Sequence, residues 1–160
     1  MNHNHILRIL ALLLVIAMIV ICILLAQPVR AAGQRIVDWP DLWEPDEAEV
    51  VALAQTLYGK CRGCSELQQR AVCWCIFNRV DDSRFPDTVI GVITQRSQFF
   101  GYSSSNPVWD SLYDVAKDCL MDWHNGENRV FGPEFLFFHG DGTKNHFTTA
   151  WNGGEEWCEE

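Results

Sequence analysis

Apolar residues form one uninterrupted block near the N-terminus of the chain. Residues 9–26 contain no charge and no proline, and Arg8 precedes them. These eighteen residues reach the lower limit for a helix that crosses a bilayer core of about 30 Å. They also exceed the usual signal-peptide core of about 7–15 residues. Val29-Arg30-Ala31-Ala32 follows, with small or compact residues where a signal peptidase accepts them, so we predict that residues 1–32 are a signal peptide or a membrane anchor. The rest of the chain is then extracytoplasmic, either secreted or held at the membrane by residues 9–26.

Helical spacing begins after a short linker. Residues 33–45 show little pattern and contain Pro40 and Pro45, which predicts a linker. From Asp46 on, acidic residues occupy what would be a first helical turn, where the helix dipole favours them. Apolar residues then recur at spacings of three and four as far as Cys61. The pattern predicts a helix that ends near Gly59 and Gly63, in a domain that spans residues 46–160.

Two further helices are predicted downstream. Ser65 is a suitable N-cap for the second helix, and Gln68 completes a capping box. The apolar stripe of this helix continues to Val80, and residues 84–88 then break the pattern before a short turn over 89–93. Residues 98–107 are typical of an exposed loop. A third helix is expected over about residues 108–123, with its stop at Asn125-Gly126.

The last part of the chain predicts a small β element. Residues 135–138 and 146–149 are β-prone runs, and the polar stretch between them contains Asp141-Gly142. Two such runs joined by a turn predict a hairpin, with its phenylalanines mostly in the core. Three or four helices with one hairpin place the domain in the α+β class.

Charge narrows the possible partners. The formal net charge is −9, and the chain has no cluster of Lys and Arg. Nucleic-acid binding depends on such clusters, so no nucleic-acid partner is expected. An acidic exported protein more plausibly meets an uncharged carbohydrate or a peptide.

The cysteines allow several interpretations. Of seven cysteines, Cys22 lies in the apolar block, and six lie in the predicted domain. An extracytoplasmic location permits disulfides, but the sequence does not give their pairing. The pairs Cys61/Cys64 and Cys73/Cys75 supply four thiols, as a structural zinc site requires. The spacing of Cys73 and Cys75 points them to different helix faces, so we expect no metal and no cofactor. A Cys61–Cys64 disulfide and plain buried thiols remain the alternatives.

The segment over residues 53–80 reads LAQTLYGKCRGCSELQQRAVCWCIFNRV and resembles the SleB/CwlJ-type cell wall hydrolases. The family pattern there is approximately L-A-x-x-x-Y-x-E-A-R-G-E, followed by Q-x-A-V and N-R-V. Later stretches match in the same order: Arg84-Phe85-Pro86-Asp87-Thr88-Val89, Gly91-Val92-Ile93, Gln98-Phe99, Phe137-Phe138-His139-Gly140-Asp141-Gly142 and Asn145-His146-Phe147. The resemblance covers about residues 46–150, nearly all of the predicted domain.

The resemblance implies cleavage of peptidoglycan glycan strands by a fold related to lysozyme and lytic transglycosylases. Such cleavage requires a protonated carboxylic acid, usually a Glu whose pKa is raised by burial. Hydrolysis usually adds a second carboxylate, whereas a transglycosylase uses a hydroxyl of the sugar itself. The sequence alone does not separate these two reactions, nor action on the vegetative wall from action on spore cortex.

Lys60 departs from the family pattern at its most consequential position. The family's catalytic Glu aligns with Lys60, its second Glu with Cys64 and its Ala with Cys61. Three interpretations follow. The chain is a decayed or repurposed enzyme that still binds glycan, or the catalytic role has moved to another acid such as Glu66, or Lys60 is a recent single change. A dipole-favoured surface position is the simpler explanation for Glu66.

Several other residues are candidates for contact with a glycan. Exposed amide and aromatic side chains suit N-acetyl groups and sugar faces, and loops concentrate such residues. The candidates for substrate binding are Arg62, Asn78, Gln98, Phe99, Tyr102, Asn106 and His139. The structural alternatives are an ion pair for Arg62, a core hydrogen bond for Asn78 and an exposed position on the hairpin for His139.

Two other classes of function compete with glycan cleavage. A cysteine peptidase with His139 or His146 as the base needs one activated thiol, and the spacing identifies none. A membrane-tethered peptidoglycan-binding module without catalytic activity is the stronger rival, because Lys60 replaces the expected acid.

Overall fold

Four helices and three strands make up the part of the domain that the computed structural model describes. Residues 16–18 and 43–160 are described, and residues 16–18 are helical. The predicted leader and linker otherwise lie outside the described residues, so both stay predictions. No helix among the described residues is long and apolar enough to cross a membrane.

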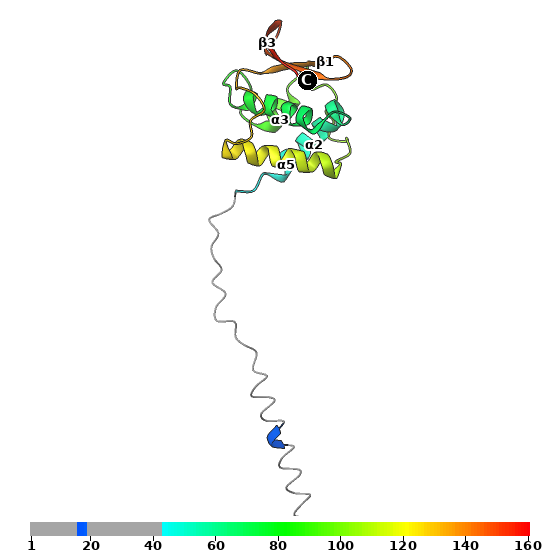
Figure 1. The fold of residues 1–160 in the computed structure, drawn as a ribbon, viewed down its shortest axis with the longest axis vertical. Helices are drawn as coiled ribbons and strands as arrows, with labels where there is room; N and C mark the ends of the chain where they lie inside the picture. The colour runs from blue at the N-terminus through cyan, green and yellow to red at the C-terminus, as the bar shows by residue number, and fades with distance from the viewer. Residues whose placement is uncertain (1–15, 19–42) are drawn as a thin grey trace, which may run out of the picture. The chain divides into compact units, whose positions relative to one another are not determined.

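The elements pack in layers around a central helix. Helices α2 (Glu47–Cys61), α3 (Glu66–Val80), α4 (Val89–Thr94) and α5 (Asp110–Asn125) precede strands β1 (Phe137–Gly140), β2 (Asn145–Ala150) and β3 (Gly153–Trp157). In Figure 1, α3 lies between α5 and the sheet. The sheet is antiparallel with the order β1-β2-β3, and Phe138 pairs with Phe147. The prediction of an α+β fold is confirmed, while the relation to lysozyme stays a prediction.

Local capping explains where the helices begin and end. The Asp46 carboxylate accepts a hydrogen bond from the Ala48 N–H (2.8 Å), and the Ser65 hydroxyl accepts one from the Gln68 N–H (3.2 Å). Gly126 ends α5 with φ of 71°, a left-handed conformation that glycine adopts without strain. These three positions agree with the sequence-based expectations.

The predicted capping box is wrong in its second half. The Gln68 side chain is buried and exchanges hydrogen bonds with the backbone of Asn145. It accepts from the Asn145 N–H (3.0 Å) and donates to the Asn145 C=O (3.4 Å). The side chain therefore joins the start of β2 to α3, which leaves it unable to cap α3.

Helix α2 ends at Cys61, between Gly59 and Gly63, where its end was predicted. Two other elements differ from the sequence-based expectations: residues 89–94 form a short helix, and β3 extends the predicted hairpin to three strands. Gly59 does not end the helix because its role is close packing. A Cβ at Gly59 would lie 1.9 Å from the carbonyl oxygen of Gly101.

The core is built around α3, with Trp74, Phe77 and Ile76 fully buried. Phe77 stacks on Trp123 of α5 with 4.8 Å between ring centroids. On the opposite side, α3 contacts β2, where Phe147 is also fully buried. Trp43 stacks on His124 of α5, with 4.0 Å between ring centroids.

Candidate functional site

The C-terminal end of α2 and the β1–β2 turn enclose a hollow around Lys60. One part has a volume of about 310 Å³ and the other about 130 Å³. Both parts are lined by Lys60, Cys64, Gly142 and Thr143, so they are adjacent. We call this space the Lys60 hollow; its remaining lining residues are Cys61, Arg62, Gly63, Gly140, Lys144 and Asn145.

Lys60 is held against an aromatic ring at this position. Its Nζ lies 5.3 Å from the centroid of the Phe138 ring, within the range of a cation–π contact. Burial lowers the pKa of the Lys60 amine below its usual value. Among the described residues that line the hollow, none is Asp or Glu. The hollow therefore presents cations, an amide and a hydroxyl, but no carboxylic acid.

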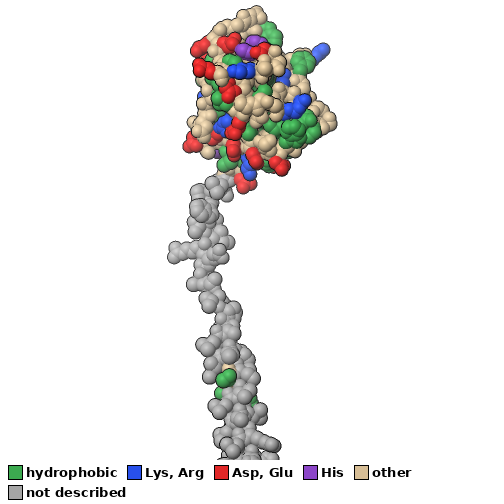
Figure 2. Space-filling model, turned by 45° about the vertical axis from the view of Figure 1, so that its right-hand side comes forward, with side chains coloured by type: hydrophobic (Ala, Val, Ile, Leu, Met, Phe, Trp, Pro, Cys, Tyr) green, Lys and Arg blue, Asp and Glu red, His purple; other side chains and the backbone are tan. Residues whose placement is uncertain are grey.

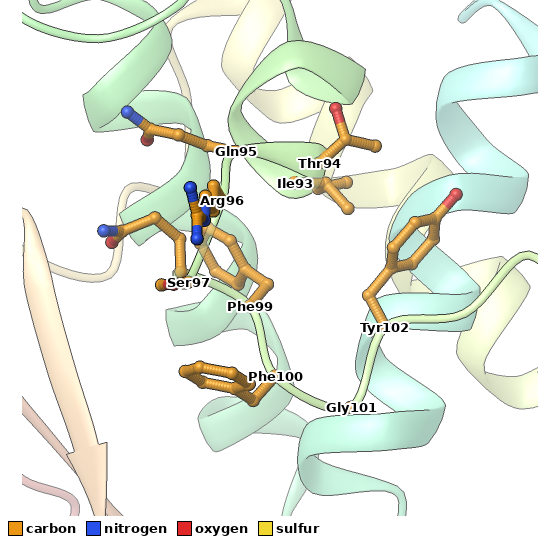
Figure 3. Close-up of a pocket in the computed structure, with 10 residues that line it drawn as sticks. Ile93, Thr94, Gln95, Arg96, Ser97, Phe99, Phe100, Gly101 and Tyr102 are labelled. Atoms are coloured by element: carbon orange, nitrogen blue, oxygen red, sulfur yellow. The ribbon is translucent and has the colours of Figure 1, made fainter.

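A second hollow lies in the loop that packs on α2. Residues 93–102 enclose about 370 Å³, and Figure 3 shows Phe99, Phe100 and Tyr102 spaced along this loop. Phe100 is 72% exposed, whereas Phe99 is buried. The contact between Gly101 and Gly59 places this loop beside the residue that precedes Lys60. An exposed aromatic side chain therefore belongs to a loop that packs on the same end of α2 as the Lys60 hollow.

The Gly59–Gly101 contact carries a testable consequence. Alanine normally favours a helix over glycine by about 1 kcal/mol. At Gly59 the added methyl group would instead meet backbone atoms, so we expect Gly59→Ala to cost about 1–3 kcal/mol of unfolding free energy. The control is Gly63→Ala, because a Cβ there meets nothing within 4 Å. Urea unfolding of both variants measures the difference, and equal stabilities would contradict the packing role of Gly59.

Several predicted substrate-binding residues are committed to internal contacts. Asn78 is buried, donates to the carbonyl oxygens of Gly132 (2.9 Å) and Phe135 (3.0 Å), and accepts from Arg129. Asn106 Nδ2 donates to the carbonyl oxygens of Gln55 and Gly101. These amides hold loops in place, so neither amide nitrogen is free for a ligand in this structure.

The loop residues Gln98 and Phe99 are held by Arg79. Its guanidinium donates to Gln98 Oε1 (2.8 Å) and to the Leu136 carbonyl oxygen (2.6 Å). It also lies 5.2 Å from the centroid of the Phe99 ring. Arg79 therefore links α3 to the 93–102 loop and to β1. Tyr102 lines the loop hollow and remains half-buried, with part of its ring exposed.

The remaining candidates are distributed over separate surfaces. Arg62 lines the Lys60 hollow and also lies over the Tyr58 ring, 5.0 Å from its centroid. Glu66 instead lines a different hollow together with Arg70 and Asp122. His139 stacks on His146 on the sheet, with ring centroids 5.1 Å apart. The structure thus brings Arg62 to Lys60 and separates Glu66 from it.

Sequence reasoning missed three residues that line the Lys60 hollow. Thr143, Lys144 and Asn145 face the end of α2 across about eighty residues of sequence. Their polar Gly-rich context predicted a turn, which is correct, but gave no signal of contact with Lys60. Nearby, the Ser65 hydroxyl donates to the Glu159 carboxylate, and Lys144 Nζ donates to the Glu159 carbonyl oxygen. Glu159 therefore contacts two residues at the edge of the hollow.

A histidine between two carboxylates joins the β1–β2 turn to β3. His146 Nε2 lies 3.0 Å from Asp141 Oδ2, and its Nδ1 lies 2.9 Å from Glu156 Oε1. Figure 2 shows histidine side chains among acidic ones at the end of the molecule that holds the sheet. Hydrogen bonds to Asp141 and then Glu156 raise the pKa of His146, while His146 holds the pKa of Asp141 well below its usual range.

These shifts predict the pH dependence of stability. Protonated His146 stabilises the fold fully below its unfolded pKa of about 6.5, and this contribution is lost as pH rises through the higher folded pKa. Ionised Asp141 acts in the opposite sense and loses its contribution as pH falls below about 4. We expect the thermal midpoint to fall between pH 6 and pH 9, and to fall less in His146→Gln. An unchanged slope in the variant would contradict this role.

The described cysteines are free thiols in this structure, and most are buried. Cys73, Cys75 and Cys119 have no exposed surface, and Cys61 is 3% exposed. Cys64 and Cys158 are partly exposed. Within residues 43–160, no three His, Cys, Asp or Glu side chains are grouped as a metal site requires. Cys22 lies outside the described residues.

Comparison with known proteins assigns the chain to a family. The model of the Cell Wall Hydrolase family matches residues 63–156, so the chain belongs to this family of peptidoglycan hydrolases. The match begins at Gly63, and the alignment of Lys60 with a catalytic Glu therefore stays a prediction. No solved structure matches the chain.

Three curated relatives are spore cortex-lytic enzymes. That of Oceanobacillus iheyensis is 33% identical over 78 residues, which are 49% of this chain and 28% of the relative. That of Halalkalibacterium halodurans is 29% identical over 89 residues, 56% of this chain and 27% of the relative. That of Bacillus cereus is 33% identical over 93 residues, 58% of this chain and 35% of the relative. The match thus spans about a third of the length of these relatives.

Proposed function

We propose that this protein acts on the glycan strands of peptidoglycan through the Lys60 hollow, and that with lysine at this position it binds strands without cleaving them. The observation that carries the proposal is the absence of any Asp or Glu among the described residues that line the hollow. The family acts on peptidoglycan, and the resemblance described above implies that its glycan-cleaving acid aligns with Lys60, which supports the proposal. The protein therefore binds the substrate of its family without cleaving it.

The chemistry of glycosidic cleavage explains why Lys60 is a poor substitute for Glu. Cleavage needs a proton on the bridging oxygen while positive charge develops on the sugar ring. A carboxylic acid donates that proton and becomes an anion, which stabilises the charge. When Lys60 is an ammonium ion, it places a second positive charge beside the one that develops on the sugar ring. When Lys60 is a neutral amine, it has no acidic proton to donate. Both forms disfavour the transition state.

The polar groups of the hollow suit a glycan strand. The Asn145 amide and the Thr143 hydroxyl can hydrogen-bond to N-acetyl and hydroxyl groups of sugars. Arg62 and Lys144 provide cations for the carboxylates of the peptide stems. The exposed ring of Phe100 can lie against a sugar face. These groups recognise a strand without any catalytic acid.

Co-sedimentation with purified peptidoglycan tests the proposal. We expect the wild-type full chain, kept in mild detergent, to pellet with insoluble peptidoglycan and to release no soluble muropeptides. Thr143→Trp places a large side chain at an exposed position in the wall of the hollow and should reduce binding at least tenfold. The matched control Asp114→Trp, at an exposed position on α5, should bind as wild type does. Equal binding by both variants would place the binding surface elsewhere.

The location of this activity follows from the N-terminal block. We propose that residues 9–26 direct the domain out of the cytoplasm, as a cleaved signal or as a membrane anchor. An anchored binding domain would hold the membrane close to the wall or to spore cortex, where strands are remodelled. N-terminal sequencing of the mature protein tests the two forms, because cleavage would expose a new terminus near Ala32.

A further inference from the structure

The turn between α2 and α3 brings two cysteines close together. Cys61 is the last residue of α2, and Cys64 directly precedes Ser65, the N-cap of α3. The Cys64 N–H donates to the Cys61 carbonyl oxygen (3.0 Å), which closes a four-residue turn. Such a turn holds its end Cα atoms within about 7 Å, and a disulfide spans about 4.4–6.8 Å. Each thiol also perturbs the pKa of the other, which agrees with two side chains that lie close together.

Cys64 is the member of the pair that a reagent can reach. It is partly exposed and lines both parts of the Lys60 hollow, whereas Cys61 lies beneath it at 3% exposure. Cys73 and Cys119 also contact each other, but both are completely buried. A thiol reagent in solution therefore meets Cys64 well before these two. Burial raises the pKa of both Cys61 and Cys64, so the reaction is slow at neutral pH.

We propose that Cys61 and Cys64 are an oxidisable pair that forms a disulfide in the wall of the Lys60 hollow when it meets a small-molecule or protein disulfide. The Cys64 thiolate attacks one sulfur of the reagent disulfide, which releases one reagent thiolate and leaves a mixed disulfide on Cys64. The Cys61 thiol then loses its proton to solvent and attacks Cys64 Sγ, which releases the second reagent thiolate. The protein pair loses two electrons and two protons, and the reagent is reduced to two thiols.

The bond changes the wall of the hollow. In the reduced state, Cys64 Sγ accepts a weak hydrogen bond from Asn145 Nδ2 at 3.9 Å. A bond to Cys61 draws this sulfur toward the buried side of the turn and releases the amide, which also lines the hollow. The effect on strand binding rests on the proposed function. The disulfide itself does not, because its formation depends only on the two thiols.

Peptide mapping after oxidation tests the pair. The full chain in mild detergent is incubated with oxidised glutathione, quenched with acid, alkylated and digested with trypsin without reduction. Trypsin cuts after Lys60 and Arg62, so Cys61 and Cys64 fall on separate peptides. We expect these two peptides to be joined, and to separate on reduction. In the untreated folded protein, iodoacetamide should label Cys64 at least about tenfold faster than Cys73 or Cys119.

Two variants make the assignment specific. Cys61→Ser should stop the reaction at a stable glutathione adduct on Cys64, and Cys158→Ser should leave the Cys61–Cys64 link intact. Three results would overturn the proposal: a Cys64–Cys158 link, a lasting glutathione adduct on wild-type Cys64, or both thiols still open to alkylation. None of these results bears on whether the hollow binds glycan strands, so a failure here is distinct from a failure of the proposed function.

Discussion

Lys60→Glu is expected to convert a protein that releases no muropeptides from purified peptidoglycan into one that does. The new carboxyl would stand beside the Phe138 ring at a half-buried position, where desolvation raises its pKa and keeps it protonated. A positioned general acid contributes about 10²–10⁴-fold to such a reaction. We therefore expect Lys60→Glu to release soluble muropeptides, identified by mass spectrometry, under conditions in which wild type releases none.

Lys60→Gln is the matched control for this gain. It has the same length as Glu and removes the charge of Lys60, but it cannot donate the proton that cleavage requires. It should bind strands and release nothing. Products with anhydro ends from Lys60→Glu would indicate transglycosylation, and reducing ends would indicate hydrolysis. Release by wild type at the rate of Lys60→Glu would show that the acid lies elsewhere, and Glu66 and Glu159 would then be the residues to replace.

Arg79→Ala is expected to cause the largest loss of stability among the variants considered. Arg79 is 3% exposed and donates to the Leu136 carbonyl oxygen and to Gln98. Its guanidinium also lies within 5.6 Å of the ring centroids of Phe85, Phe99 and Phe137. Truncation leaves a buried carbonyl without its donor and a space between the rings. We expect a cost of about 3–5 kcal/mol in unfolding free energy, measured by urea denaturation.

Arg84→Ala is the control, because it removes a positive charge without removing buried contacts. The Arg84 side chain is 66% exposed, pairs with Asp82 two residues away, and lies 5.9 Å from the centroid of the Phe85 ring. Exposed pairs of this kind contribute little, so we expect no measurable change in the free energy of unfolding. If the two variants lose similar stability, Arg79 does not hold the loop and β1 together as described.

Elements with local signals were predictable from the sequence. Asp46 and Ser65 mark helix starts, and Gly126 marks a helix end, because each is decided within a few residues. Features that depend on distant contacts were not predictable. Gly59 resembles a helix stop until Gly101 is seen against it, and Gln68 resembles half of a capping box until β2 is seen beside it.

The residues of the candidate site likewise divide into those that the sequence predicts and those that it does not. Lys60 and Arg62 were identified by a motif, and both line the hollow. Thr143 and Asn145 were not identified, because their proximity to Lys60 arises only when the β1–β2 turn folds over the end of α2. Asn78 matched a family position, but its amide holds the segment before β1. A motif therefore identified the candidate site, while the fold determined which side chains share it.

Labelling of individual lysines tests the central claim most directly. Burial lowers the pKa of Lys60, which favours reaction of its amine with an acylating reagent, and mass spectrometry reports the labelling rate of each lysine. With soluble glycan strands present, we predict that labelling of Lys60 and Lys144 slows severalfold while that of Lys117 on α5 is unchanged. If the strands bind but Lys60 is labelled as fast as before, the Lys60 hollow is not the glycan site.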